Sequence, residues 1–152
     1  MEIAELGQQH RAALRGFSCA GGSSQVWSRD AEFMVHALPS ELEHPDSTNA
    51  GIGAFGADGE LVGVAAWSSD PARPDIWTCR LLAVRTGMRQ RGFGALLKRD
   101  VLRRAHTTNA ATLVSFVHRD NEPMLRLNTS LGATMRADPI LPEYLIFTIR
   151  IR

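Results

Sequence analysis

The chain has 152 residues and a formal net charge of +1 at pH 7, and this length is typical of one domain with a substantial core. A charge this small gives no electrostatic reason to expect binding to nucleic acid or to a membrane surface, and no apolar stretch is long enough to span a bilayer. Cys19 and Cys79 are too few for a disulfide framework. We therefore expect residues 1–152 to form a single cytoplasmic domain.

The first third of the chain predicts a short strand and two helices. Residues 2–6 are expected to form the strand, and residues 8–16 have a helical composition that ends at a glycine. In residues 26–38 apolar side chains recur at helical spacing, and Pro39 is expected to end that helix. The apolar stripe on the second helix indicates core packing.

An acidic segment follows the second predicted helix. Residues 39–50 are expected to form a loop with three carboxylates, Glu41, Glu43 and Asp46, and one imidazole, His44. One interpretation is an ordinary solvated surface loop. The other is the mouth of a site, because grouped carboxylates attract a cationic amine.

The middle of the chain predicts two hairpin strands and then a buried strand. The hairpin covers residues 51–67, because Asp58-Gly59 stands between two apolar runs. A second loop, residues 68–75, leads to the apolar run of residues 78–84. That run suits a strand buried on both faces.

A glycine turn and a helix come directly after this strand. The turn, residues 89–94, reads RQRGFG, and apolar side chains then recur at helical spacing up to residue 105. A helix start has unpaired N–H groups and the positive end of the helix dipole, so it binds anions, phosphates above all. The alternative is an ordinary tight turn with solvated arginines. The polar face of the helix is predicted to hold Lys98, Arg99, Asp100, Arg103 and Arg104.

Two other phosphate-binding motifs do not fit this turn. A dinucleotide fingerprint needs a small residue where Leu97 stands. A nucleotide-triphosphate loop needs Lys and then Ser or Thr after its last glycine, and Phe93 and Gly94 occupy those places.

The last third predicts a strand, a helix and two more strands. Residues 111–117 form a strand that a right-handed crossover makes parallel to the earlier buried strand. Pro123 begins a helix that ends before Gly132. Asn128 lies on the apolar stripe of this helix, and a buried amide without partners costs roughly 1–3 kcal/mol. It therefore either bonds to neighbouring backbone or faces a ligand. Residues 133–152 are expected to form two strands around a proline-containing loop.

The pattern R-x-x-G-x-G after a strand that ends in Leu-Ala-Val resembles the acetyl-CoA-binding motif of the GNAT superfamily of N-acetyltransferases. The resemblance implies an α/β (α+β) fold with a mixed central β-sheet and helices on both faces. In that family the backbone amides of the turn hold the CoA pyrophosphate, and the end of the preceding strand pairs with the pantetheine arm. The cofactor-binding residues that it implies are Leu82, Ala83, Val84, Arg89, Gln90, Arg91, Gly92, Phe93, Gly94, Ala95, Asn121 and Asn128.

The helix of the last third is also similar to the family. Asn121 matches a family Asn, and Leu131-Gly132-Ala133 matches the end of the same family segment. Asn128 stands where the family often has a Tyr that protonates the departing CoA thiolate. Asn cannot supply that proton, so the identity of the acid is left open.

The residue that accepts the proton of the amine is less clearly marked. Many family members place a Glu on the central strand, where this chain offers Thr78 and Arg80. His118 is the candidate catalytic base, because ligands gather at the carboxyl ends of parallel strands and an unperturbed imidazole has a pKa near ~6.5. The alternative is a partly exposed His that begins a loop. Strand amides that polarise the thioester carbonyl are a further source of catalysis.

The resemblance implies an N-acetyltransferase that moves an acetyl group from acetyl-CoA, the co-substrate, to a primary amine of a small molecule or protein. The alternative is a non-catalytic acyl-CoA-binding or regulatory module on the same fold, since the usual Tyr and Glu are missing. No metal, nucleic-acid or membrane partner is expected, and a homodimer is compatible with the sequence.

Overall fold

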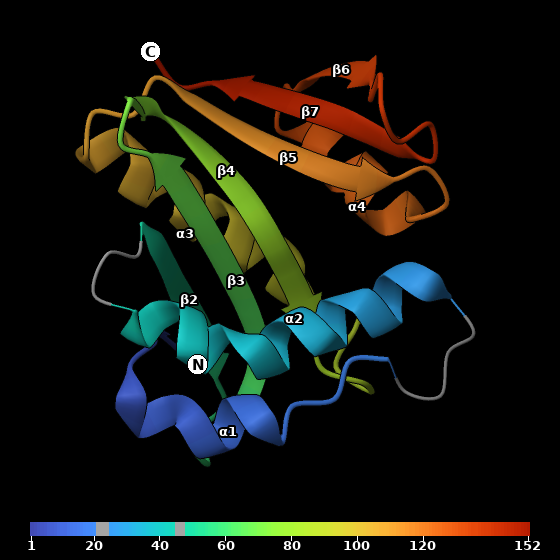
Figure 1. Cartoon of the computed structure of the whole chain (residues 1–152). Helices are drawn as coiled ribbons and strands as arrows, with labels where there is room; N and C mark the ends of the chain where they lie inside the picture. The colour runs from blue at the N-terminus through green and yellow to red at the C-terminus, as the bar shows by residue number, and fades with distance from the viewer. Residues whose placement is uncertain (21–24, 45–47) are drawn as a thin grey trace.

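The computed structural model describes residues 1–20, 25–44 and 48–152. Seven strands of this part of the chain form one sheet in the order β1-β2-β3-β4-β5-β7-β6 (Figure 1). The β4–β5 pair is parallel, and the other neighbouring pairs are antiparallel. The strands are β1 Glu2–Glu5, β2 Asn49–Phe55, β3 Leu61–Asp70, β4 Arg73–Val84, β5 Thr112–His118, β6 Thr134–Ala137 and β7 Tyr144–Arg150.

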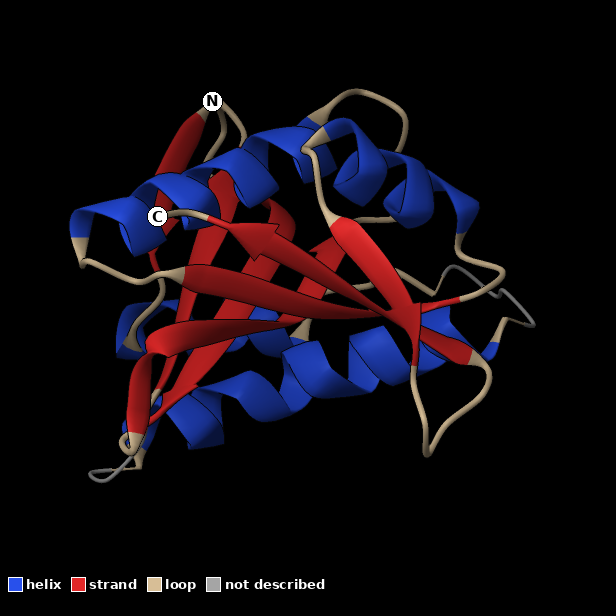
Figure 2. Ribbon diagram, turned by 90° about the horizontal axis from the view of Figure 1, so that it is seen from above, coloured by secondary structure: helices blue, strands red, loops and turns tan. Residues whose placement is uncertain are grey.

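Helices cover both faces of this mixed sheet (Figure 2), which confirms the fold predicted from the sequence. One face carries α1 and α2, and the other carries α3 and α4. The helices are the short 3-10 turn η1 Gln8–His10, α1 Arg11–Arg15, α2 Val26–Glu43, α3 Phe93–Thr107 and α4 Glu122–Ser130. Within the described ranges, no helix has both the length and the apolar composition needed to cross a bilayer.

The core is divided between the two faces of the sheet. On one face Leu14 of α1 and Leu38 of α2 pack with Val64 of β3. On the other face Leu97 and Val101 of α3 belong to a second apolar cluster. Residues 64–67 of β3 alternate between these clusters, because neighbouring side chains of a strand point to opposite faces. The position of α3, and of the turn before it, is therefore fixed by burial.

Strands β4 and β5 pair over only part of their length. Their parallel pairing runs from Ile76 opposite Thr112 to Cys79 opposite Ser115. Beyond that point the two strands diverge, and α2 crosses in front of the open end (Figure 1). Residues 80–84 of β4 therefore have β3 on one side and no strand on the other.

The prediction that Pro39 ends the second helix is wrong, since α2 continues to Glu43. Pro39 costs the helix one backbone hydrogen bond. Tertiary contacts offset that cost, because Pro39 and Leu38 are buried and Leu42 packs against the same core. Glu41 and Glu43 thus belong to the last turn of a helix rather than to a loop.

The predicted loop over residues 68–75 is a tight hairpin instead. Strand β3 runs on to Asp70 and β4 begins at Arg73. The Asp70 carboxylate accepts a hydrogen bond from the Ala72 N–H at 2.9 Å, which closes the turn locally. The expectation that residues 78–84 are buried on both faces is also wrong, because Leu82 and Val84 keep partial exposure.

Candidate active site

A cavity of about 400 Å³ lies at the gap between β4 and β5. Its walls come from the ends of these strands, from α2 on one face of the sheet, and from α3 and α4 on the other. It therefore reaches both faces of the sheet. The structure brings these sequence-predicted site residues together in its lining: Leu82, Ala83, Val84, Arg89, Gln90, His118, Asn121 and Asn128.

The glycine turn lies next to this cavity, and residues 91–95 are not part of the lining. Gly92 caps α3 with a φ of 83°, a left-handed conformation that favours glycine. Counting from Gly92, the first backbone N–H that donates a hydrogen bond is that of Leu96, which donates to the Gly92 carbonyl at 3.0 Å. Among the described residues, the N–H groups of residues 92–95 donate no hydrogen bond. Four adjacent free donors at the positive end of a helix suit an anion.

Arg89 ties the turn to the N-terminal segment. Its guanidinium donates to the Cys19 carbonyl, and the Thr86 N–H donates to the Ser18 carbonyl at 2.9 Å. The pKa of the Cys19 thiol is raised to about 11, mainly by burial. The negative charge of Glu32 raises this pKa further, and the positive charge of Arg89 lowers it. The Cys19 thiol is therefore protonated at neutral pH.

The fold agrees with the results of sequence and structure comparison. The model of the GNAT acetyltransferase family matches residues 23–133. The chain belongs to this family. No curated protein sequence matches the chain significantly.

Several solved GNAT structures share this fold over almost the whole chain. The PaiA N-acetyltransferase of Thermoplasma acidophilum, in complex with coenzyme A, has 15% sequence identity and a TM-score of 0.76, and 99% of each chain is covered. A GNAT acetyltransferase of Staphylococcus aureus Mu50 has 13% identity and a TM-score of 0.77, again with 99% of each chain covered. The ribosomal-protein-S18-alanine N-acetyltransferase of Escherichia coli has 16% identity and a TM-score of 0.72, with 99% of this chain and 93% of that one covered. At these identities the likeness shows the fold alone.

His118, the predicted base of this GNAT domain, is held by two aromatic rings at the end of β5. Its ring stacks on Trp27 with a centroid distance of 4.8 Å and meets the edge of Tyr144 at 5.3 Å. The Asp120 N–H donates to its Nδ1 at 3.1 Å. A nitrogen that accepts this bond carries no proton, so the neutral ring has its proton on Nε2. The Asp120 carboxylate lies 3.9 Å from the same nitrogen.

Tyr144 is a site residue that sequence reasoning missed. It lines the cavity and pairs with His118 across β5 and β7. Burial, followed by the charges of Asp30 and Glu143, raises the pKa of its hydroxyl. Tyr144 therefore remains a hydrogen-bond donor throughout the ordinary pH range. It is the only tyrosine in the chain, and no motif in the sequence marks it.

The acidic segment is engaged in ion pairs rather than open to a ligand. Glu41 bonds to Arg80, with its Oε2 3.0 Å from the guanidinium, and Glu43 pairs with Arg11. Asp46, the third carboxylate of the prediction, lies outside the described residues. The described carboxylate that lines the cavity is that of Asp30, on α2.

The prediction that Lys98 lies on the polar face of α3 is wrong. Its side chain is 1% exposed and lines the cavity, and its Nζ donates to the Ser115 hydroxyl. Asn128 is 0% exposed and fits both alternatives that the sequence left open. Its Nδ2 donates to the Met124 carbonyl at 2.9 Å, whereas its Oδ1 has no partner among the described residues.

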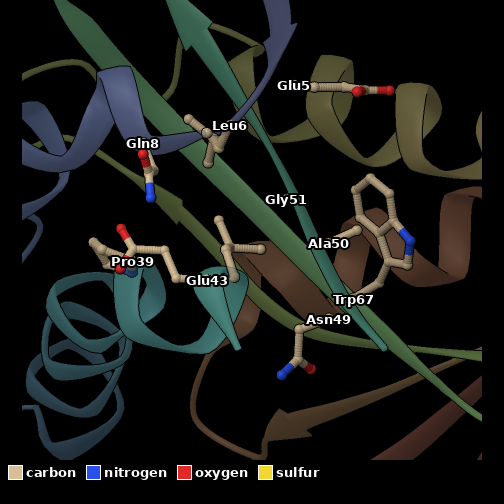
Figure 3. Close-up of a pocket in the computed structure, with 11 residues that line it drawn as sticks. Glu5, Leu6, Gln8, Pro39, Glu43, Asn49, Ala50, Gly51 and Trp67 are labelled. Atoms are coloured by element: carbon tan, nitrogen blue, oxygen red, sulfur yellow. The ribbon is translucent and has the colours of Figure 1, made fainter. Parts of the chain in front are cut away.

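A second cavity, of about 410 Å³, lies away from the gap (Figure 3). It is bordered by the end of β1, by β2 and by the last turns of α2. Figure 3 shows Glu43 and Trp67 among its labelled residues, but Glu43 is paired with Arg11, and Trp67 stacks on Trp77 at 5.1 Å. Glu43 of the acidic segment lines it, but none of the predicted catalytic or cofactor-binding residues does. Across residues 1–20, 25–44 and 48–152, no group of His, Cys, Asp and Glu is arranged to hold a metal ion.

Proposed function

We propose that this GNAT protein transfers an acetyl group from acetyl-CoA to a primary amine of a small molecule or protein. The observation that carries the proposal is the continuity of the site. Free amides at the start of α3 lie next to a cavity whose wall is an unpaired strand end, and the cavity reaches both faces of the sheet. A CoA thioester requires an anion site and an extended edge on one side, and its acceptor requires an entrance on the other.

The cofactor fits the loop and the strand end as follows. The amides of residues 92–95 hold the pyrophosphate, and Arg91 adds positive charge beside it. The backbone of residues 82–84 pairs with the amides of the pantetheine arm, as an added strand would. The thioester then lies in the gap, where Asn121 and Asn128 line the wall. The coenzyme A complex of the PaiA N-acetyltransferase, which has the same fold, supports this assignment.

The acceptor amine enters from the face covered by α2. Trp27, His118 and Tyr144 form an aromatic wall there, and the Asp30 carboxylate attracts a cationic amine. His118 accepts the proton of the amine as the amine attacks the thioester carbonyl, and its Nδ1 gives up the hydrogen bond from the Asp120 N–H to do so. The likeness to an enzyme that acetylates a protein alanine supports an amine acceptor. We also place the protein in the cytoplasm, where acetyl-CoA is available.

Two measurements test the proposal. Calorimetry with acetyl-CoA should show binding, and a free-thiol assay with a panel of primary amines should show CoA release for at least one of them. Binding without turnover on any amine would favour the second candidate, a non-catalytic acyl-CoA-binding module. Two features support that candidate, since the central strand offers Thr78 and Arg80 where many family members have a Glu, and Asn128 stands where many have a Tyr. No binding of acetyl-CoA would reject both.

A further inference from the structure

The gap between β4 and β5 ends at a buried ammonium group. In the described part of the chain, Lys98 is the one charged side chain that is less than a tenth exposed. Its Nζ bonds to the neutral Ser115 hydroxyl, and no described carboxylate lies within ion-pair distance. A buried charge without an opposite charge is strongly unfavourable. The site therefore favours a partner that carries negative charge.

The Lys98 ammonium lies at the point where β4 and β5 stop pairing. Ser115 is the last residue of β5 that pairs with β4, opposite Cys79, and the strands diverge beyond it. Lys98 Nζ is thus at the closed end of the gap, whereas the glycine turn borders its open end. A CoA arm that starts at the turn and follows residues 82–84 brings its sulfur toward Lys98.

The chain's use of basic residues sets Lys98 apart. It is the only lysine in the sequence, and the other 16 of the 17 basic residues are arginines. Arginine keeps its proton in proteins, whereas lysine can release one when it is buried. Among the lysine and arginine side chains, the one able to release a proton therefore lies in the cavity.

Asn128 defines which anion suits the site. Because its Nδ2 donates to the Met124 carbonyl, its unpartnered Oδ1 is left as the free atom of a residue that lines the same cavity. An acceptor oxygen repels a carboxylate, but it accepts a hydrogen bond from an S–H or N–H group. Lys98 as donor and Asn128 as acceptor together match a group that is an anion in one state and a neutral donor in the next. The sulfur of CoA is such a group.

We propose, on the basis of the proposed acetyl transfer, that Lys98 is the general acid that protonates the departing sulfur of CoA. As the tetrahedral intermediate collapses, the C–S bond breaks and its electron pair moves to sulfur. One Nζ proton passes to that sulfur, which gives the CoA thiol and a neutral amine on Lys98. Asn128 Oδ1 accepts the new S–H. The proton that His118 took from the acceptor amine is released to solvent, and solvent returns one to Lys98.

Lys98→Met tests this role, because methionine fills a similar space without the charge and replacement of a buried ion by an apolar side chain is tolerated. We expect acetyl-CoA affinity within about threefold of the parent and turnover lower by about 100-fold or more, the range that general acids contribute. Arg99→Met is the matched control, since it removes an exposed cation from the same helix. It should change neither quantity.

The ultraviolet absorption of the CoA thiolate separates this role from a structural one. Bound CoA should ionise at lower pH than free CoA in the parent and in Lys98→Arg, because a cation is present in both, and this shift should disappear in Lys98→Met. Lys98→Arg should nevertheless turn over slowly, because the guanidinium does not release its proton.

Several outcomes would overturn the assignment. Full turnover in a folded Lys98→Met protein would do so, as would an unchanged thiolate spectrum in that variant. A parent that binds malonyl-CoA or succinyl-CoA more than tenfold tighter than acetyl-CoA, with the preference lost in Lys98→Met, would instead make Lys98 a reader of acyl carboxylates. If the parent binds CoA but acetylates no amine, the proposed acetyl transfer fails. The thiolate spectrum then still shows whether the Lys98 ammonium lies beside the CoA sulfur. If it binds no CoA, both fall.

Discussion

The two ends of the cavity differ in the kind of group that they offer to a ligand. The open end offers backbone amides of residues 92–95, and Gly92, with a φ of 83°, permits the turn that exposes them. The closed end offers the side-chain atoms of Lys98, Ser115 and Asn128. The backbone site at the open end can be predicted from a short sequence pattern. The side-chain site at the closed end depends on how the helices pack on the sheet.

A charge at the open end should have the largest effect. Gly92→Asp places a side chain at a φ of 83° and a carboxylate beside the expected phosphates. We expect acetyl-CoA affinity, measured by calorimetry, to fall by more than about 100-fold. Gly132→Asp is the control, because Gly132 has a φ of 80° and lies beyond the end of α4. A folded Gly92→Asp protein with unchanged affinity would contradict the phosphate assignment.

Cys19 lines the cavity, and its carbonyl accepts a hydrogen bond from Arg89 of the turn. The next largest effect is expected for the reactivity of its thiol. A pKa of about 11, against an ordinary 9.0, lowers the thiolate fraction at pH 8 by about 100-fold. Alkylation of Cys19 by iodoacetamide, followed by mass spectrometry, should be slower than alkylation of a model thiol by at least that factor, because Cys19 is also only 2% exposed. Glu32→Gln should speed it, because the Glu32 charge helps to raise this pKa.

The same shift gives the pH dependence of stability a definite sign. The folded chain holds the Cys19 proton more tightly than the unfolded chain does. This stabilisation is present below pH 9 and is lost as the pH rises toward about 11. Denaturant unfolding should therefore show a loss of stability over that interval, and the loss should be smaller in Cys19→Ala. An equal loss in both proteins would remove Cys19 as its cause.

At the closed end, Asn128→Ala should lower turnover by about tenfold, the order of one lost hydrogen bond at the reacting centre. The shape of the pH–rate profile should not change, because an amide does not titrate. Thr129→Ala is a matched control, since Thr129 makes the same kind of bond to the carbonyl four residues earlier on the exposed side of α4. A shift of the alkaline limb in Asn128→Ala would make this residue part of the acid after all.

Asp30→Asn tests the acceptor entrance and should have a small effect. An exposed carboxylate contributes about 0–1 kcal/mol to an ion pair, so the KM for a cationic amine should rise no more than about fivefold. The KM for acetyl-CoA should stay the same, and the difference should shrink as salt is added. Glu2→Gln, at the exposed start of β1, is the control. Equal amine kinetics at low salt would remove Asp30 from the entrance.

The Arg80–Glu41 ion pair should have a smaller effect than Asp30. Both side chains are about a third exposed, so a double-mutant cycle on the free energy of unfolding should give a coupling below about 1 kcal/mol. The more exposed Arg126–Glu122 pair on α4 should give less still. A coupling of several kcal/mol would show that Arg80 has a structural role that its exposure does not suggest.

The sequence predicted the elements whose signal is local. Hairpin β2–β3, the glycine turn and α3 follow from Asp58-Gly59, from Gly92 and from an apolar stripe. Pro39 misled because the packing of α2 outweighs one lost hydrogen bond. Lys98 was wrongly predicted to lie on the polar face of α3. Helical spacing gives the direction of its side chain, but it does not show which strands the sheet places under that side of the helix. The contact with Ser115 arises only once β5 is placed beside β4.

The divergence of β4 from β5 has a consequence for solvent exchange and for self-association. On the gap side of residues 80–84, alternate backbone N–H and C=O groups have no strand partner, so this stretch behaves as an edge strand in the middle of a sheet. We expect its amides to exchange with deuterium faster than those of Ile76 to Cys79, and to slow when a ligand arm covers them. An unpaired edge also recruits foreign strands, and here α2 in front of the opening restricts that access (Figure 1).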